Sequence, residues 1–273
     1  MALKLMFITN NPAIADIADH AGVDRIFVDL ETIGKQERQG GMDTVQSQHS
    51  IEDIRSIRNV LNRSQLFVRV NQIYDGSKEE IDAVIQAGAE VIMLPYFKSV
   101  EQVRTFLRCV NGRAKTCLLF ETVESVRLAE EILALDGIDE CYIGLNDLHL
   151  ESGKKFMFEL LADGTVDNLC KIFSSAGKPY GFGGIARIGT GTLSADRILA
   201  EHTRLGSSSV ILSRSFCNAA AMESLDEIQN VFFQEVPKLR RWEQELSRKT
   251  PDFFEDNKSQ VKSIVSQIVE AMT

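Results

Sequence analysis

"TCLLFETVESVRLAEEILAL" (residues 116–135) joins a short apolar run to an amphipathic stretch, and units of this kind recur along the chain. The apolar run is continuous rather than alternating, which is typical of a parallel strand covered on both faces. The second part has helical periodicity. Glu121 stands at the junction, where a carboxylate is costly to desolvate unless something pairs with it. The stretch therefore predicts a strand, a helix and, between them, a carboxylate that needs a partner.

Eight such runs alternate with helix-like stretches over roughly 215 residues, which predicts an α/β protein built as a (β/α)8 TIM barrel. A doubly wound sheet is the alternative, and the regular repeat favours the barrel. We expect a catalytic barrel domain over residues 1–216 and a C-terminal helical extension over residues 217–273, packed on the barrel or on a neighbouring subunit. The predicted strands are residues 3–9, 25–31, 66–71, 91–96, 116–122, 141–148, 179–185 and 208–213.

Composition narrows the class of protein. The chain has 273 residues, of which 44% are hydrophobic and 25% charged, as in an ordinary globular protein. A net charge of -9 without a basic tract argues against binding to nucleic acid or to an anionic membrane surface. The five cysteines form no C-x-x-C pair, and no apolar stretch is long enough to span a bilayer. We therefore expect a reduced, cytoplasmic protein.

Polar residues gather where the predicted strands end. In a barrel of this type the chemistry lies at the C-terminal ends of the strands. Arg69 ends the third strand, Glu121 the fifth, and Asn146 and Asp147 the sixth. Two acids on consecutive strands near an arginine predict a concave site with oxygen ligands for a hard divalent cation such as Mg²⁺. The structural alternatives are that Glu121 interacts with the dipole of the next helix and that Asp147 pairs with Arg69.

These motifs resemble the HpcH/HpaI aldolase and citrate lyase β-subunit superfamily, a branch of the phosphoenolpyruvate/pyruvate barrel enzymes. The "E-T" after the fifth strand and the "G-x-x-D-L" after the sixth are the more specific features, because they occur together and in the right order. The resemblance covers about residues 3–215. The segments that carry it are residues 13–31, 67–71, 81–103, 118–126 and 143–148.

The resemblance implies a site and a reaction. Glu121 and Asp147 would bind a divalent metal, Mg²⁺ or Mn²⁺, and Arg69 would clamp the carboxylate and oxyanion of a pyruvate-like moiety. The reaction would be the cleavage or formation of a 4-hydroxy-2-oxo acid through a metal-stabilised pyruvate enolate. The small-acid pocket would be bordered by Gly144, Leu145 and Asn146.

The chain departs from the family after the second strand. The aldolases carry Glu-His there, whereas this sequence has Glu31 followed by Thr32, and the acidic pair of the citrate lyase branch is incomplete as well. The nearby histidine is His49, at the far end of a long polar loop, residues 32–49. Loops of this length are often functional. We expect His49 to fold back over the site as general base; the alternative is a solvated loop histidine.

A second departure is the abundance of Gly, Ser and Arg after strands seven and eight. In barrels these loops often hold a phosphate through backbone N–H groups. The alternative is that the glycines only form turns and that the arginine lies on the surface. The candidate second-anion site, for a distal carboxylate, a phosphate or part of coenzyme A, consists of Gly184, Arg187, Ser213 and Arg214.

Together these features predict a divalent-metal-dependent carbon–carbon lyase of the class II aldolase type. Its substrate would be a small 2-oxo acid or a related hydroxy acid. A citrate lyase-like acyl-CoA lyase or thioesterase is the alternative among enzymes. A catalytically weak barrel that serves as a binding or assembly protein is the alternative of another class. The apolar faces of the extension and the resemblance predict a homo-oligomer, either a trimer or a hexamer.

Overall fold

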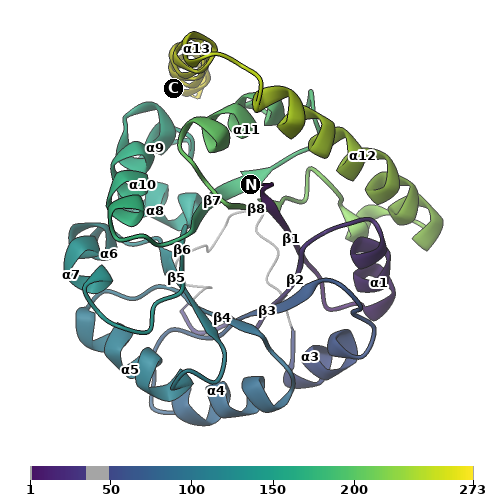
Figure 1. The fold of residues 1–273 in the computed structure, drawn as a ribbon, viewed down its shortest axis with the longest axis vertical. Coiled ribbons are helices and arrows are strands. Elements are labelled where there is room, and N and C mark those ends of the chain that lie inside the picture. The colour runs from purple at the N-terminus through teal and green to yellow at the C-terminus, as the bar shows by residue number, and fades with distance from the viewer. Residues whose placement is uncertain (1, 35–48, 273) are drawn as a thin grey trace.

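Eight parallel strands close into a barrel in their sequence order (Figure 1). The structure is a computed structural model that describes residues 2–34 and 49–272. Strand β8 pairs with β1 and so closes the ring. The strands are β1 (Lys4–Ile8), β2 (Arg25–Asp29), β3 (Gln65–Arg69), β4 (Val91–Leu94), β5 (Lys115–Phe120), β6 (Glu140–Ile143), β7 (Tyr180–Ile185) and β8 (Ser209–Leu212). The predicted α/β barrel is confirmed.

Helices surround the barrel and connect its strands (Figure 1). A short 3₁₀-helix, Ala219–Ala221, precedes the last two long helices. The α-helices are α1 (Pro12–His20), α3 (Ile51–Arg58), α4 (Ser77–Gln86), α5 (Val100–Val110), α6 (Val123–Arg127), α7 (Ala129–Leu133), α8 (Leu145–Glu151), α9 (Glu159–Ala162), α10 (Thr165–Ser175), α11 (Ala195–Arg204), α12 (Leu225–Leu246) and α13 (Pro251–Ala271).

Two apolar layers hold this arrangement together. The larger lies between the strands and the surrounding helices. The smaller fills the barrel interior, as expected of a closed eight-stranded barrel whose inward side chains pack in layers. The interior layer therefore forms a solid floor beneath the C-terminal mouth of the barrel. It consists of Met6, Phe27, Phe67, Val91, Met93, Cys117, Leu119 and Tyr142.

The sixth predicted strand is shorter than the apolar run suggested. Strand β6 ends at Ile143, and helix α8 begins at Leu145. Leu145 and Leu148 are three residues apart and both buried, a spacing that puts them on one face of a helix but on opposite faces of a strand. Asp147 consequently lies in the first turn of a helix rather than at the end of a strand.

The C-terminal helices cover one side of the barrel (Figure 1). Helix α12 packs on α1 and α11, and α13 packs on α11 and α9. Trp242 of α12 donates its indole N–H to the carbonyl oxygen of Asp196, 3.1 Å away. Asn257 of α13 donates to Oε1 of Glu201 at 2.8 Å. Apolar faces of the extension therefore contact the barrel's own helices, while the division after residue 216 and a contact with another subunit stay predictions.

The cysteines behave as small apolar side chains. All five lie in the described part of the chain and are free thiols. Burial raises the pKa of the Cys117 thiol well above its usual range and that of Cys170 to about 12, so both stay protonated. Within residues 2–34 and 49–272, no helix combines the length and the apolar character that crossing a bilayer requires.

A buried histidine makes the fold sensitive to acid. His202 of α11 stacks on the ring of Phe182 at 3.7 Å between centroids, and its Nδ1 lies 2.8 Å from Oγ of Ser207. Burial lowers the pKa of His202 to about 3. In the unfolded chain that pKa is about 6.5, so protonation favours unfolding as the pH falls below about 6.5 and continues to do so down to about 3.

We expect His202→Phe to remove this acid sensitivity. Between pH 7 and pH 5 the histidine should cost the wild-type protein about 2 kcal/mol of unfolding free energy. Phenylalanine preserves the ring stack, and the hydroxyl of Ser207 still has an acceptor in the carbonyl of Tyr180, 3.3 Å away. Urea unfolding at both pH values measures the difference. Equal pH dependence in the two proteins would contradict the prediction.

Candidate active site

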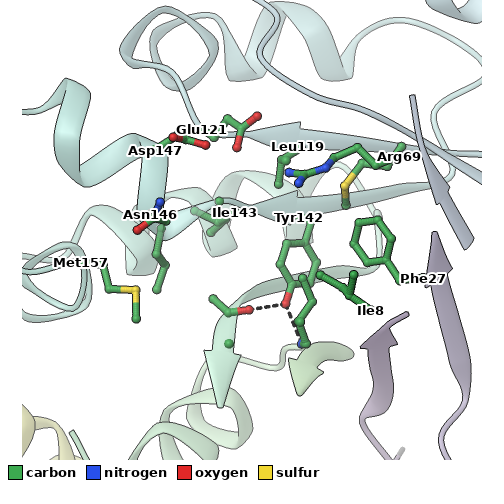
Figure 2. A pocket seen from close by; sticks show the side chains of 16 residues that line it. Ile8, Phe27, Arg69, Leu119, Glu121, Tyr142, Ile143, Asn146, Asp147 and Met157 are labelled. Atoms are coloured by element: carbon green, nitrogen blue, oxygen red, sulfur yellow. Dashed lines mark hydrogen bonds between the residues drawn. The ribbon is translucent and has the colours of Figure 1, made fainter. Parts of the chain in front are cut away.

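A cavity of about 280 Å³ opens at the C-terminal mouth of the barrel (Figure 2). Its floor is apolar because it rests on the interior layer of the barrel. Its polar groups come from the ends of β3 and β5 and from the first turn of α8. The polar lining residues are Arg69, Glu121, Asn146 and Asp147, and the apolar ones are Ile8, Phe27, Met93, Leu119, Tyr142, Ile143, Leu145, Met157 and Ile211. Gly144, Gly183 and Gly184 complete the lining.

Glu121 follows β5 directly and is buried, with 2% of its surface exposed. The backbone N–H of Tyr96 donates to its Oε1 at 2.9 Å. A Cβ placed on Gly144 would lie only 2.8 Å from its Oε2, so the absence of a side chain at Gly144 makes room for the carboxylate. The next residue, Thr122, caps helix α6 with its own side chain, as the sequence indicates. Glu121 is therefore oriented by the backbone that follows β4 and by the turn after β6.

Asp147 lies in the first turn of α8 and is also buried, with 8% exposure. Figure 2 shows the carboxyl groups of Glu121 and Asp147 at the same end of the cavity. Gly144, Leu145 and Asn146 line the cavity beside them. The structure thus brings together the two acidic residues and the small-acid pocket residues that the sequence singled out.

Arg69 projects from the end of β3 into the cavity (Figure 2). Its Nε and Nη2 each donate to a carboxylate oxygen of Asp29 at 2.8 Å, and Nη1 lies 3.2 Å from Oε2 of Glu31. Burial disfavours the charged guanidinium, but Asp29 and Glu31 outweigh it, so the pKa of Arg69 stays well above its usual range. The bidentate face of Arg69 is thus directed at Asp29 and not at the cavity.

The partner of Arg69 was not identified from the sequence, although a signal existed. Asp29 and Arg69 are aligned residues on the neighbouring strands β2 and β3, so their side chains leave the sheet at the same level. Both Asp29 and Glu31 are almost fully buried. Two acidic residues after one strand and an arginine at the aligned position of the next are the pattern that predicts such a triad.

His49 lies next to the end of β2. Its Nδ1 accepts the backbone N–H of Asp29 at 2.9 Å. When Nδ1 accepts this bond, a neutral ring carries its proton on Nε2. Nε2 can accept a proton only after that proton has left, and in the tautomer protonated on Nδ1 the bond with Asp29 is broken. Residues 35–48, which are most of the long polar loop that leads to His49, lie outside the described part of the chain. The start of that loop is held by Asn71, whose Oδ1 accepts the N–H of Thr32 at 2.9 Å.

Tyr142 shapes the floor of the cavity and was read from the sequence only as part of an apolar strand. Its hydroxyl donates to the carbonyl of Gly183 at 2.6 Å and accepts the N–H of Ile211 at 3.0 Å (Figure 2). It occupies the place where the register between β7 and β8 shifts. Gly183 has φ of +56°, a left-handed conformation that side-chain-bearing residues rarely adopt. The bonds of Tyr142 therefore stabilise the irregular strand beside the cavity.

The candidate second-anion residues lie in or directly after the neighbouring strands β7 and β8. Gly184 lines the cavity, whereas the other three are not among its lining residues. Nε of Arg187 donates to the carbonyl of Phe216 at 2.7 Å, so part of its guanidinium binds the backbone of the loop after β8. Arg214 is exposed, and the N–H of Ser213 donates to Ile185. A second-anion site at these residues stays a prediction.

The residues of the cavity fit a hard divalent cation. Mg²⁺ and Mn²⁺ take oxygen ligands and are commonly bound by one or two carboxylates, with substrate oxygens and water completing the shell. Glu121 and Asp147 supply such a pair, both buried and both facing the cavity. Residues 2–34 and 49–272 contain no group of three or more His, Cys, Asp and Glu side chains arranged for a metal. The donor set therefore favours a cation that needs two carboxylates over a closed zinc site.

Comparisons with known proteins agree with the barrel fold. A family model described as HpcH/HpaI aldolase/citrate lyase matches residues 4–200. No match was found among curated proteins.

Among solved structures, an HpcH/HpaI aldolase from Desulfitobacterium hafniense DCB-2 is 17% identical, with a TM-score of 0.59, and the match covers 78% of this chain and 86% of that one. An HpcH/HpaI aldolase/citrate lyase family protein from Burkholderia cenocepacia J2315 is 15% identical, with a TM-score of 0.62 and coverage of 84% and 95%. The citrate synthase SbnG is 16% identical, with a TM-score of 0.62 and coverage of 84% and 94%. At these identities the structural likeness shows the fold.

Proposed function

The chain belongs to the HpcH/HpaI aldolase/citrate lyase family, and from this premise we propose that it is a divalent-metal-dependent carbon–carbon lyase that cleaves or forms a 4-hydroxy-2-oxo acid. One observation carries the proposal. Glu121, Asp147 and Arg69 come from three separate elements of the barrel and line one cavity of about 280 Å³. That volume suits a small organic acid rather than a polymer.

The proposed cation ligands are Glu121 and Asp147, with Mg²⁺ or Mn²⁺ as the metal. In the cleavage direction the substrate's 4-hydroxyl loses its proton, the C3–C4 bond breaks, and its electron pair stays on the pyruvate half as an enolate while an aldehyde leaves. The bound cation would supply the positive charge that stabilises this enolate.

Arg69 is proposed to orient the substrate. Asp29 accepts one N–H from Nε and one from Nη2, and Glu31 forms an ion pair with Nη1, so donors on Nη1 and Nη2 are proposed to bind a carboxylate or carbonyl oxygen in the cavity. The same two acids fix the plane of the guanidinium, so its remaining donors are preorganised. Arg69 would therefore hold the oxygen end of the substrate.

The direct test is the release of pyruvate from a panel of 4-hydroxy-2-oxo acids. We expect release with Mg²⁺ or Mn²⁺ and a large loss of rate in the presence of a chelator. Acyl-CoA substrates are assayed in parallel, and release of free coenzyme A instead of pyruvate would favour a citrate lyase-like enzyme. If the protein binds neither cation at millimolar concentration and turns over neither substrate class, the proposal fails.

His49 is proposed as the proton-transfer group, because its ring lies at the end of β2 beside Asp29, which holds Arg69; accepting the substrate's proton on Nε2 would break its bond with the N–H of Asp29. We expect His49→Ala to lower the turnover number by roughly 10²–10⁴-fold while Mn²⁺ affinity stays unchanged. Steady-state kinetics with saturating metal measures this. The matched control is His20→Ala, since His20 is exposed on α1 and pairs with Asp16. Unchanged turnover in His49→Ala would remove this residue from the mechanism.

A further inference from the structure

One carboxylate joins three segments that adjoin residues lining the cavity, and these joined segments are called the rim. Glu151, the last residue of α8, pairs through Oε1 with Nζ of Lys98 at 2.8 Å. Its Oε2 accepts the backbone N–H of Val123, the first residue of α6, at 2.6 Å. Glu151 therefore ties α8 both to the start of α6 and to the connection between β4 and α5.

The joined segments are those that carry or orient the proposed cation ligands. Asp147 lies one helical turn before Glu151 on α8. Val123 comes two residues after Glu121. Lys98 comes two residues after Tyr96, whose N–H donates to the Glu121 carboxylate. A displacement of any one segment would change the separation or the orientation of the two carboxylates.

The backbone at Tyr96 shows that this rim is held under constraint. Tyr96 has φ of +47°, which is rare for a large side chain and persists only where the surroundings enforce it. Its ring lies under Nζ of Lys98, 4.7 Å from nitrogen to ring centroid. The bond with Glu151 raises the pKa of Lys98, so the lysine stays charged in this position. Lys98 thus connects the constrained residue to Glu151.

We propose that Glu151 and Lys98 are positioning residues that set the affinity of the cavity for a divalent cation without contacting the cation. The inference rests on the proposed cation site at Glu121 and Asp147. It predicts that loosening the rim weakens cation binding even when the substitution removes a positive charge.

A substitution that removes a positive charge distinguishes positioning from simple electrostatics as the cause of a change in cation affinity. Removing the negative charge of Glu151 weakens the attraction for a cation under either explanation. For removal of the positive charge of Lys98 the two explanations predict opposite results. The electrostatic explanation predicts tighter cation binding, whereas positioning predicts weaker cation binding. Lys98→Met is therefore the decisive variant, and it retains most of the apolar stem of the side chain.

The test is titration of the purified full-length protein with Mn²⁺, followed by electron paramagnetic resonance of the free ion. We expect the dissociation constant to rise about 10-fold in Glu151→Ala and about 3-fold in Lys98→Met. The matched control is Asp163→Asn, because Asp163 likewise bonds a lysine, Lys154, and the N–H of a first helical residue, Thr165, away from the cavity. The control should bind Mn²⁺ as the wild type does.

The outcomes distinguish this inference from the proposed function. If the wild-type protein does not bind Mn²⁺, the proposed function itself fails. If the wild type binds and Lys98→Met binds equally well or more tightly, the positioning role is wrong while the function stands. Melting temperatures of the metal-free proteins identify general destabilisation, since Glu151→Ala and Asp163→Asn remove comparable surface interactions and should shift the melting temperature by similar amounts.

Discussion

Asp147→Asn is expected to lower the affinity for Mn²⁺ by more than about 100-fold while the barrel stays folded. The change replaces one of two carboxylates by a neutral group of nearly the same shape. Loss of a group that only supports a metal ligand typically costs 10–100-fold in affinity, so loss of a ligand should cost more. Asp147 is buried and lines the cavity together with the buried acid Glu121. Removing one of these two negative charges should not destabilise the metal-free protein.

Two measurements check this result. Titration with Mn²⁺ gives the affinity, and thermal unfolding with and without metal gives the stabilisation that the ion confers. At a concentration of 100 times the dissociation constant, the ion should add about 2.7 kcal/mol to the unfolding free energy of the wild type and almost nothing to that of the variant. Asp163→Asn serves again as control. A variant that unfolds without metal would mean that Asp147 is a structural residue.

The barrel could be predicted because its signal is repeated and local. Each buried parallel strand is a continuous apolar run, and eight of them in order leave few other architectures. The end of β6 was misplaced because no polar residue separates Ile143 from Leu145, the first residue of α8, and the three-residue spacing of Leu145 and Leu148 marks the change. Element boundaries of this kind depend on which face is covered, which the sequence does not state.

The residues at the site could be named, but not their bonds. Glu121, Asp147 and Arg69 were found because polar groups at strand ends must meet at one mouth of the barrel. The pairing of Arg69 with Asp29 depends on the register between β2 and β3, and the left-handed backbone of Tyr96 depends on contacts that span three segments. Both features arise from tertiary structure: the sequence supplies the candidate partners of Arg69 but not the strand register that pairs them, and it carries no comparable sign of the Tyr96 conformation.

The largest expected effect on stability lies at the opposite end of the barrel. Arg25 and Glu140 are the first residues of β2 and β6, and Arg25 is 1% exposed. Nη1 and Nη2 of Arg25 donate to the two carboxylate oxygens of Glu140 at 2.6 and 2.5 Å. Burial raises the pKa of Glu140, but the bonds and charge of Arg25 outweigh this, so the net pKa is lowered. The pair therefore crosses the barrel as a buried, mutually dependent unit.

Arg25→Met should destabilise the protein by about 3–5 kcal/mol at pH 7, because the buried carboxylate of Glu140 loses both of its hydrogen-bond donors and keeps only the charges of Lys4, 3.5 Å away, and of Lys115 as partial compensation. Urea unfolding measures the loss. With Arg25 gone, the pKa of Glu140 rises above that of the unfolded chain, so protonation favours the folded variant and the deficit should shrink as the pH falls toward 4.

The double variant Arg25→Met/Glu140→Leu tests the cause. If the loss in Arg25→Met reflects an unpaired buried charge, removing that charge should restore most of the stability, because a well-packed apolar pair can replace a buried ion pair at little cost. If it reflects only the lost contact of the Arg25 guanidinium with the ring of Phe67, the second substitution restores nothing. Recovery in the double variant would mean that the pair adds little to the unfolding free energy. Its role would then be to determine strand placement, because any arrangement that separates Arg25 from Glu140 leaves a buried charge unpaired.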